Sequence, residues 1–321
     1  SLHSINSAIL SEEREYRITV PKSYSWARNR SYPVLYILDG QQHHDHSVAS
    51  VQFLADWGEI PEMIVVAITS TARLRDYTPT DWKDGFAGGG GAPDFRRFLS
   101  DELIPEIGKN FRVNQFRIFS GHSLGGLFAL YLVSAAPAVF DAHIALSPTL
   151  NWDDGVPLRL LEERLKGTEE FPAYLYVARS DDTGLYLADF DYLTQLLRTY
   201  APRKFRWTSE AFPQETHGSI TLVAQIAAIR DLYAGYRFHD DLSMMGVDFA
   251  ERHYAKLSAM LGTRVEVPEQ ALNNIGYAAL SEDKLEEAIR VFSRNVDENP
   301  YSCLLYTSPS PRDGTKDLVC R

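Results

Sequence analysis

The chain has 321 residues, a formal net charge of −11 at pH 7 and a hydrophobic fraction of 45%. This length suits one large domain with an appendage, and this apolar content is enough for a buried core. The net negative charge argues against nucleic acids and anionic membrane surfaces as partners, because both are bound through basic patches. No apolar run approaches the roughly 18 residues that would cross a bilayer, so no membrane segment is expected.

Cysteine usage and the amino terminus leave the compartment open. Both cysteines, Cys303 and Cys320, lie in the last stretch, so the region before them needs no disulfide and offers no thiolate metal site. The chain begins with Ser1 rather than Met, so we expect that any signal peptide has been removed. A soluble protein is therefore expected, either cytoplasmic or exported.

Short apolar runs alternate with helical patterns along most of the chain. The expected strands are, in chain order, residues 14–20, 33–38, 63–68, 116–120, 142–146, 173–177 and 205–211. The expected helices are residues 48–57, 95–109, 127–133, 157–165, 187–200 and 219–236. This alternation predicts an α/β fold, in which a mostly parallel central sheet is flanked by helices on both faces.

A glycine-rich run at residues 87–92 is expected to form a mobile loop near the entrance of a site. A phosphate-binding loop is the alternative interpretation. The Lys-Ser/Thr ending of that motif is absent, however, and no strand directly precedes the run, so we favour the loop.

The α/β domain is expected to span residues 1–238, and residues 239–300 are predicted to be a small helical segment. Within that segment Leu272, Gly276, Ala288 and Phe292 fall on the spacing of a tetratricopeptide repeat of about 34 residues. An unrelated helical hairpin is the alternative. A single repeat cannot bury its apolar face alone, so we expect it to pack on the α/β domain or on a second chain, and we favour a homodimer.

Residues 301–321 contain no apolar periodicity. They are predicted to form an irregular tail, which we interpret as a non-native ending and exclude from functional reasoning.

The pentapeptide Gly121-His122-Ser123-Leu124-Gly125 has the pattern G-x-S-x-G. A short apolar run that reads as a strand precedes it, and a longer apolar run that reads as a buried helix follows it. A strand, a sharp turn and a helix are the context of a nucleophile elbow. The flanking glycines are needed because the serine occupies a strained turn. We therefore predict Ser123 as a catalytic nucleophile rather than part of a plain strand-to-helix turn.

Serine is a weak nucleophile at neutral pH, so it needs a base and a third group that holds the base. In α/β-hydrolases the chain order is Ser, then Asp or Glu, then His. His217 follows the last expected strand and precedes the last helix of the domain, so it is the predicted base. His122 lies inside the elbow and is expected to point elsewhere.

The acid is expected just after the strand at residues 173–177. Asp182 is favoured, because the third position beyond the turn at the end of that strand usually carries the acid. Asp181 and Glu215 are the alternatives, and a turn or helix cap is the structural alternative for one of the two aspartates.

The negative oxygen that forms during acyl transfer needs two preorganised N–H donors. The backbone amide of Leu124, directly after the nucleophile, is one predicted donor. Gln41 is the second, from the loop after the strand at residues 33–38, with Gly40 as the alternative.

Three histidines, His43, His44 and His46, cluster with Asp45 after an apolar strand. A zinc site is conceivable there, but clustered loop histidines without a spaced partner are weak support for one. We therefore predict no metal and no cofactor, and expect these residues to line the mouth of the site or lie on the surface.

Four segments carry a resemblance to a known family. They are Tyr36-Ile37-Leu38-Asp39-Gly40, Arg73-Leu74-Arg75-Asp76-Tyr77-Thr78-Pro79, Gly121-His122-Ser123-Leu124-Gly125-Gly126 and Ser147-Pro148-Thr149-Leu150-Asn151-Trp152. They resemble the putative-esterase family, which includes enterochelin esterases, feruloyl esterases, esterase D and the antigen 85 mycolyltransferases. The resemblance covers roughly residues 10–236.

The resemblance implies an α/β-hydrolase fold, with Ser123 as nucleophile, His217 as base and the residue after Asp39-Gly40 as an oxyanion donor. It implies the acid least firmly, because Arg179 replaces the glycine that is common at that turn and some relatives work with a dyad.

We therefore expect a serine esterase that acts through an acyl-enzyme on small-molecule esters, either short-chain or aryl (feruloyl-like). Trp152, Tyr77 and Arg75 are predicted to contact the substrate, as are Trp82, Phe86 and Arg73 more weakly. Core packing of the aromatic rings, and salt bridges from the arginines to Asp76 or Asp81, are the structural alternatives. An acyltransferase with the same triad, or a catalytically silent binding module, are the alternative functions.

Overall fold

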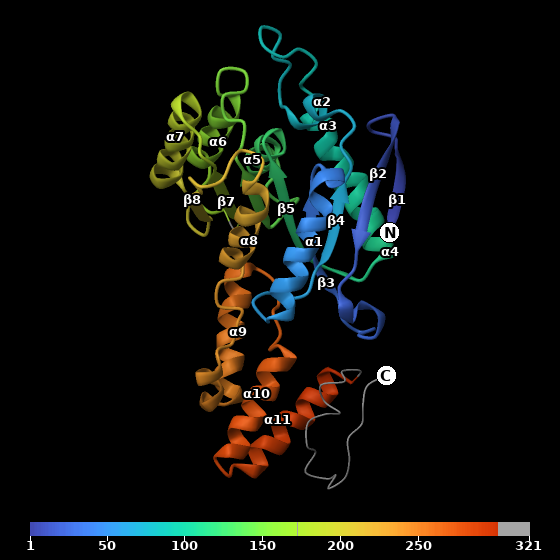
Figure 1. The fold of residues 1–321 in the computed structure, drawn as a ribbon, viewed down its shortest axis with the longest axis vertical. Helices are drawn as coiled ribbons and strands as arrows, with labels where there is room; N and C mark the ends of the chain where they lie inside the picture. Colours follow the sequence, from blue (N-terminus) through green and yellow to red (C-terminus); the bar gives the residue numbers. More distant parts are fainter. Residues whose placement is uncertain (172, 301–321) are drawn as a thin grey trace. The chain divides into compact units, whose positions relative to one another are not determined.

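The structure, a computed structural model, describes residues 1–171 and 173–300 and divides the chain into two compact units (Figure 1). The first unit comprises residues 1–20, 31–56 and 60–233. The second begins at residue 234 and also takes in residues 21–30 and 57–59. The sequence analysis separated the chain at residue 238 and did not foresee that two short segments from the amino-terminal part belong to the second unit.

An eight-stranded sheet forms the centre of the first unit, with the strand order β1-β2-β4-β3-β5-β6-β7-β8. Its strands are β1 (Leu2–Ser7), β2 (Glu12–Thr19), β3 (Tyr32–Ile37), β4 (Ile64–Ile68), β5 (Val113–His122), β6 (Ala142–Leu146), β7 (Tyr174–Arg179) and β8 (Arg206–Ala211). The pairs β1–β2 and β2–β4 are antiparallel, and the other neighbours are parallel. The predicted α/β-hydrolase fold with a mostly parallel sheet is confirmed.

The pattern of side chains explains the position of each strand in the sheet. Every residue of β3, β4 and β6 is buried, as expected for central parallel strands that are covered on both faces. In β2, buried and exposed residues alternate, which is typical of a strand with one solvent-facing side. β1 at the edge is mostly polar and half-exposed, so it carries little apolar signal, and the sequence analysis did not predict it.

Helices connect and cover these strands. They are α1 (Gly40–Asp56), α2 (Arg73–Tyr77), α3 (Ala92–Arg97), α4 (Ile104–Asn110), α5 (Leu124–Ala135), α6 (Val156–Lys166), α7 (Gly184–Tyr200) and α8 (Ile220–Leu232). α1 packs against α8, whereas α5 packs against α2 and α6. Figure 1 shows α1 and α8 in front of the sheet.

The carboxyl ends of the parallel strands gather the segments that the sequence analysis singled out. β3 leads directly into α1, β5 leads through Ser123 into α5, and β7 and β8 lead into the loops that contain Asp182 and His217. Because these strands run in the same direction, all of these segments emerge at one edge of the sheet, which is where ligands bind in open α/β folds.

The second unit is helical. It contains a 3₁₀ segment (Asp240–Met245), α9 (Val247–Leu261), α10 (Glu269–Ser281) and α11 (Leu285–Glu298). A Cβ on Gly276 of α10 would lie 2.5 Å from the Phe292 ring of α11, so glycine permits the close approach of these two helices. Arg30, from the amino-terminal part of this unit, donates a hydrogen bond to Asn299 Oδ1 at 2.7 Å. The assignment of α10 and α11 as a tetratricopeptide-type pair stays a prediction.

The irregular tail predicted for residues 301–321 lies outside the described residues. Within the part of the chain that the structure describes, no helix combines the length and the apolar character needed to span a bilayer.

Candidate active site

Ser123 occupies a backbone conformation that residues other than glycine rarely adopt, with φ 60° and ψ −116°. Such strain costs roughly 1–3 kcal/mol and persists only where the surroundings enforce it. The enforcing contacts are backbone hydrogen bonds: the Ser123 amide donates to Leu146 at 2.9 Å, and its carbonyl accepts from Leu127 at 2.9 Å and Thr149 at 3.2 Å. The serine thus stands on a fixed, sharp turn between β5 and α5, which is the geometry of a nucleophile elbow.

The glycines around Ser123 are required by close packing. A Cβ on Gly121 would overlap the backbone of Gly125, one turn further along the chain. A Cβ on Gly126 would lie 3.0 Å from Pro148 Cα, in the loop that follows β6. The elbow is therefore packed tightly between the start of α5 and the neighbouring strand, and only glycine permits this.

His217 is exposed and lies in the loop between β8 and α8. This loop has a capping-box arrangement: the Thr216 amide donates to Ser219 Oγ at 2.9 Å, and the Ser219 amide donates to Thr216 Oγ1 at 3.2 Å. Ser219 Oγ in turn donates to Glu215 Oε2 at 2.6 Å. We call residues 212–219 the base loop.

The elbow histidine contacts the base loop directly. His122 Nε2 donates a hydrogen bond to the His217 carbonyl oxygen at 2.6 Å, and the centres of the two rings are 4.6 Å apart. Burial and the neighbouring His217 lower the pKa of His122 to about 4. The sequence analysis expected His122 to point elsewhere, and it missed this contact because the base loop is about 95 residues further along the chain.

A backbone hydrogen bond joins the two loops that carry the acid candidates. The Asp181 amide donates to the Glu215 carbonyl at 2.9 Å, which joins the loop after β7 to the base loop. Asp181 itself is exposed and Asp182 is half-buried. The Glu215 carboxylate already accepts the hydrogen bond from Ser219. Asp182 is therefore the candidate that is half-buried and whose carboxylate accepts no hydrogen bond from the described residues.

The side-chain hydrogen bonds of a complete triad are not formed in this structure. Within residues 1–171 and 173–300, none links Ser123 to His217 or His217 to Asp182. Catalytic hydrogen bonds often tighten only when substrate binds, so this open arrangement is compatible with a triad.

Two helix starts meet at the predicted oxyanion site. α1 begins at Gly40 and α5 at Leu124, and they follow the neighbouring strands β3 and β5. A Cβ on Gly125 would lie 3.8 Å from Asp39 Oδ2, so the two helix starts adjoin. The first amides of a helix have no acceptor inside the helix, and its N-terminus carries partial positive charge. The amides of Leu124 and Gln41 are therefore suited to stabilise an anion.

Asp39, to which the sequence analysis assigned no role of its own, anchors the segment at the start of α1. It has a φ of 53° and accepts hydrogen bonds from Arg73 Nε at 2.8 Å and Arg73 Nη2 at 3.1 Å. Ser70 also donates to Asp39, and Ser70 Oγ lies 2.5 Å from the Tyr77 hydroxyl. The Gln41 side chain accepts from the Ser70 amide at 3.1 Å. This network fixes the segment that carries the second oxyanion donor.

Two of the residues predicted to contact substrate are buried instead. Tyr77 is 1% exposed and its ring packs against Phe95 and Phe128. Trp152 is 2% exposed and donates a hydrogen bond to Thr80 Oγ1 at 3.1 Å. Neither ring offers a free face to a ligand in this structure. The sequence could not show this, because burial of a single aromatic residue is decided by long-range packing.

Arg75 forms ion pairs with Glu12 and Asp76 at 2.5 and 2.8 Å, so it adopts the structural alternative rather than a free substrate-binding position. Arg73 is likewise paired, with Asp39.

An aromatic surface remains over the buried Trp152. Trp82 packs edge-on against it, with ring centres 5.4 Å apart, and Phe86 stacks beside it at 6.5 Å. Phe86 is 61% exposed. The loop that carries it is held by hydrogen bonds from the Gly88 amide to Asp81 at 2.8 Å and from the Gly90 amide to Thr78 at 3.1 Å.

The histidine cluster lies on the first turns of α1. His43 Nδ1 and His46 Nε2 are 3.0 Å apart, and burial lowers the pKa of both rings. His44 instead contacts Thr19 and Asp45. Among the described residues, no group of three or more potential ligands is arranged to hold a metal ion.

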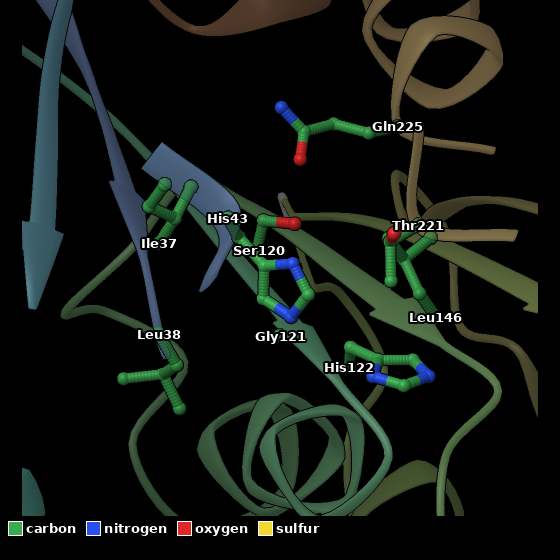
Figure 2. Close-up of a pocket in the computed structure, with 9 residues that line it drawn as sticks. All are labelled: Ile37, Leu38, His43, Ser120, Gly121, His122, Leu146, Thr221 and Gln225. Atoms are coloured by element: carbon green, nitrogen blue, oxygen red, sulfur yellow. The ribbon is translucent and has the colours of Figure 1, made fainter. Parts of the chain in front are cut away.

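A small pocket lies behind the elbow, between α1 and α8 (Figure 2). Its lining residues are Ile37, Leu38, His43, Ser120, Gly121, His122, Leu146, Thr221 and Gln225. Gln225 accepts a hydrogen bond from Ser47 at 3.0 Å, which connects α8 to α1 at the back of the pocket.

Comparison with known proteins agrees with this geometry. A family model described as Putative esterase matches residues 7–210. The ferri-bacillibactin esterase BesA of Bacillus subtilis (strain 168) is 34% identical over 167 residues, covering 44% of this chain and 56% of that protein. The apo-salmochelin esterase of Escherichia coli O6:H1 is 30% identical over 156 residues, covering 43% of this chain and 48% of that protein. The chain thus spans about half the length of these curated relatives.

Among solved structures, an IroE-like serine hydrolase from Shewanella oneidensis has a TM-score of 0.80 and 29% identity, and the match covers 92% of this chain and 99% of that one. The sheet order, the flanking helices and the strained serine between β5 and α5 are those of an α/β-hydrolase fold with a nucleophile elbow. The chain belongs to the putative esterase family.

Proposed function

We propose that the protein is a serine carboxylic-ester hydrolase that works through an acyl-enzyme on Ser123. The backbone of Ser123 carries this proposal. A serine held at positive φ, between a buried strand and the start of a helix, projects its hydroxyl from the carboxyl edge of the sheet, where an ester can approach it. A purely structural turn would not require a strained serine, because glycine adopts the same backbone conformation without strain.

In the proposed reaction Ser123 Oγ attacks the ester carbonyl carbon while His217 takes the serine proton. The amides of Leu124 and Gln41 stabilise the negative oxygen of the tetrahedral intermediate. His217 then gives its proton to the departing alcohol, which leaves the acyl group on Ser123. Water, deprotonated by His217, attacks this acyl-enzyme; the bond between the acyl carbon and Ser123 Oγ breaks, His217 returns its proton to Oγ, and the carboxylic acid leaves.

Asp182 is the proposed orienting acid. A carboxylate beside the base holds one imidazole tautomer and stabilises the imidazolium that forms during both steps. The hydrogen bond between the Asp181 amide and the Glu215 carbonyl supports this role, because it keeps the loop after β7 against the base loop.

The proposed substrates are small-molecule esters of short-chain or aryl acids. The exposed face of Phe86 beside Trp82 is suited to an aryl group. Two of the relatives are named as esterases of the siderophores bacillibactin and salmochelin. We therefore include siderophore esters among the substrates to be tested.

A homodimer through the carboxyl-terminal helices is a further part of the proposal. Leu285, Ile289 and Val296 are exposed and recur along one side of α11. Sedimentation of the full chain at several concentrations tests this: a dimer supports the proposal, and a monomer throughout contradicts it.

Turnover of p-nitrophenyl acetate tests the proposed activity. Ser123→Ala should lower kcat by about 10⁴-fold or more, because the covalent route is lost. Ser134→Ala, at the other end of α5, is the matched control, since its hydroxyl only donates to the Leu130 carbonyl within the helix. Near wild-type turnover in Ser123→Ala would end the serine-esterase proposal.

A further inference from the structure

The elbow and the base loop are joined by one short side-chain hydrogen bond. His122 Nε2 lies 2.6 Å from the carbonyl oxygen of His217 itself, rather than of a neighbouring loop residue. A carbonyl oxygen only accepts, so the Nε2 atom of His122 must carry the hydrogen. The residue directly before the nucleophile thus holds the backbone of the residue that is proposed to activate it.

The rest of the base loop is held from other directions. The Asp181 amide holds the Glu215 carbonyl, and Ser219 closes the loop onto Thr216. Neither contact involves β5, the strand that leads into Ser123. The hydrogen bond from His122 therefore links the base loop to the elbow, since it joins His217 to the residue adjacent to Ser123.

The surroundings of His122 preserve its donor role. The ring of His43, from α1, packs edge-on against it with centres 5.8 Å apart. Figure 2 shows both rings among the residues that line the pocket, with Thr221 and Gln225 of α8 drawn above them. The titratable and charged groups that act on His122 are His217, His43 and Arg73, and each of these, when charged, opposes a positive charge on His122. Together with burial they keep the ring neutral, with a defined N–H.

The alternative is that the His122 ring contributes only packing and that its hydrogen bond has no effect on activity. A residue that sets a catalytic distance does not tolerate loss of its hydrogen bond, even where the shape of the ring is kept. A displacement of about 1 Å in a catalytic group can cost about 10²-fold in rate.

We propose that His122 is a positioning residue, which sets the distance between Ser123 and His217 by donating its Nε2 hydrogen to the His217 carbonyl. This inference rests on the proposed function and adds a residue to the machinery that activates the serine. His122 takes no proton from the substrate or from Ser123.

Three variants separate the hydrogen bond from the shape of the ring. His122→Phe keeps a flat ring and removes the donor. His122→Gln places an amide N–H near the position of Nε2, and His122→Asn carries the same group on a shorter side chain that does not reach. His253→Phe is the matched control, because His253 Nε2 also donates to a backbone carbonyl, that of Gly235 at 2.6 Å, but lies in the second unit.

The measurements are kcat and KM for p-nitrophenyl acetate and the rate of covalent labelling by a fluorophosphonate. We expect His122→Phe and His122→Asn to lower kcat and the labelling rate by about 10–100-fold, with KM changed less than about threefold. His122→Gln should recover most of the loss, and His253→Phe should stay within about twofold of the parent protein. Circular dichroism establishes that each variant is folded, and the Gln/Asn comparison stands even if His122→Phe does not fold.

Equal kcat values for His122→Gln and His122→Asn would overturn the proposal, because the reach of the donor would then be irrelevant. So would a folded His122→Phe protein with unchanged kcat. These results differ from failure of the proposed function, in which Ser123→Ala itself would retain turnover.

Discussion

Three carboxylates lie in the loop after β7 and in the base loop, and their surroundings differ. Glu215 accepts a hydrogen bond from Ser219, Asp181 is exposed, and Asp182 is half-buried. A carboxylate that orients a histidine base must be shielded from water and free to accept from the ring. Asp182 meets both requirements among the described residues.

Replacing these carboxylates by their amides tests the assignment. Asp182→Asn should lower kcat by about 10²–10⁴-fold, because an amide favours the wrong histidine tautomer. Asp181→Asn and Glu215→Gln serve as matched controls and should remain within about tenfold of the parent protein. A larger loss in Glu215→Gln than in Asp182→Asn would transfer the role to Glu215.

Phe86 is the exposed member of the aromatic group above Trp152. Phe86→Ala should raise KM for an aryl ester such as methyl ferulate by about threefold to tenfold, because one aromatic contact contributes about 0.5–1.5 kcal/mol. KM for ethyl acetate should not change. Equal changes in KM for both esters would show that Phe86 does not select aryl groups.

Among the elements, the packing of α5 on the loop after β6 depends on glycine. A Cβ on Gly126 would meet Pro148 Cα at 3.0 Å and the Leu146 carbonyl oxygen at 3.1 Å. Gly126→Ala should therefore lower the free energy of unfolding by about 1–3 kcal/mol, as overpacking does.

Gly108→Ala is the matched control for that substitution. Gly108 lies in α4, and a Cβ there would meet no atom within 4 Å. Alanine is the better helix former, so Gly108→Ala should raise the free energy of unfolding by up to about 1 kcal/mol. Urea denaturation measures both variants, and a loss of stability in Gly108→Ala equal to that in Gly126→Ala would contradict the packing argument.

The central elements were predictable from sequence for a simple physical reason. β3, β4 and β6 are covered on both faces, so each is a continuous apolar run. The elbow was predictable because its glycines and serine are adjacent in the chain. β1 was missed because an exposed edge strand needs few apolar residues, and the membership of residues 21–30 in the second unit depends on contacts far along the chain.

At the site, sequence motifs located segments but not side-chain environments. Whether Tyr77 contacts substrate or packs in the core depends on Phe95 and Phe128, which lie in other elements. The bond between His122 and His217 likewise depends on how the base loop folds back over the elbow. Contacts of this kind leave no local pattern in the sequence.

Across the whole molecule, buried histidines make stability depend on pH. Burial lowers the pKa of His143 to about 4, and burial with neighbouring charge lowers that of His122 to about 4. An unfolded histidine has a pKa of about 6.5, so between about pH 6.5 and 4 the unfolded chain binds more protons than the folded one. The free energy of unfolding should therefore fall as pH decreases through this range.

His143→Leu tests this dependence without touching the proposed catalytic residues. The difference in the free energy of unfolding between pH 7 and pH 5 should be smaller in His143→Leu than in the parent protein, even if the variant is less stable at pH 7. His239→Gln, an exposed histidine in the second unit, is the control and should leave the difference unchanged. An identical pH difference in His143→Leu and the parent would contradict the expectation.

Ser123 as the covalent nucleophile is tested most directly by peptide mass spectrometry after the protein reacts with a fluorophosphonate. One adduct is predicted per chain, on the peptide that contains Ser123, and its formation should be strongly slowed in His217→Gln. An adduct on a different residue, or a protein that hydrolyses esters but never acquires an adduct on Ser123, would contradict the proposed mechanism.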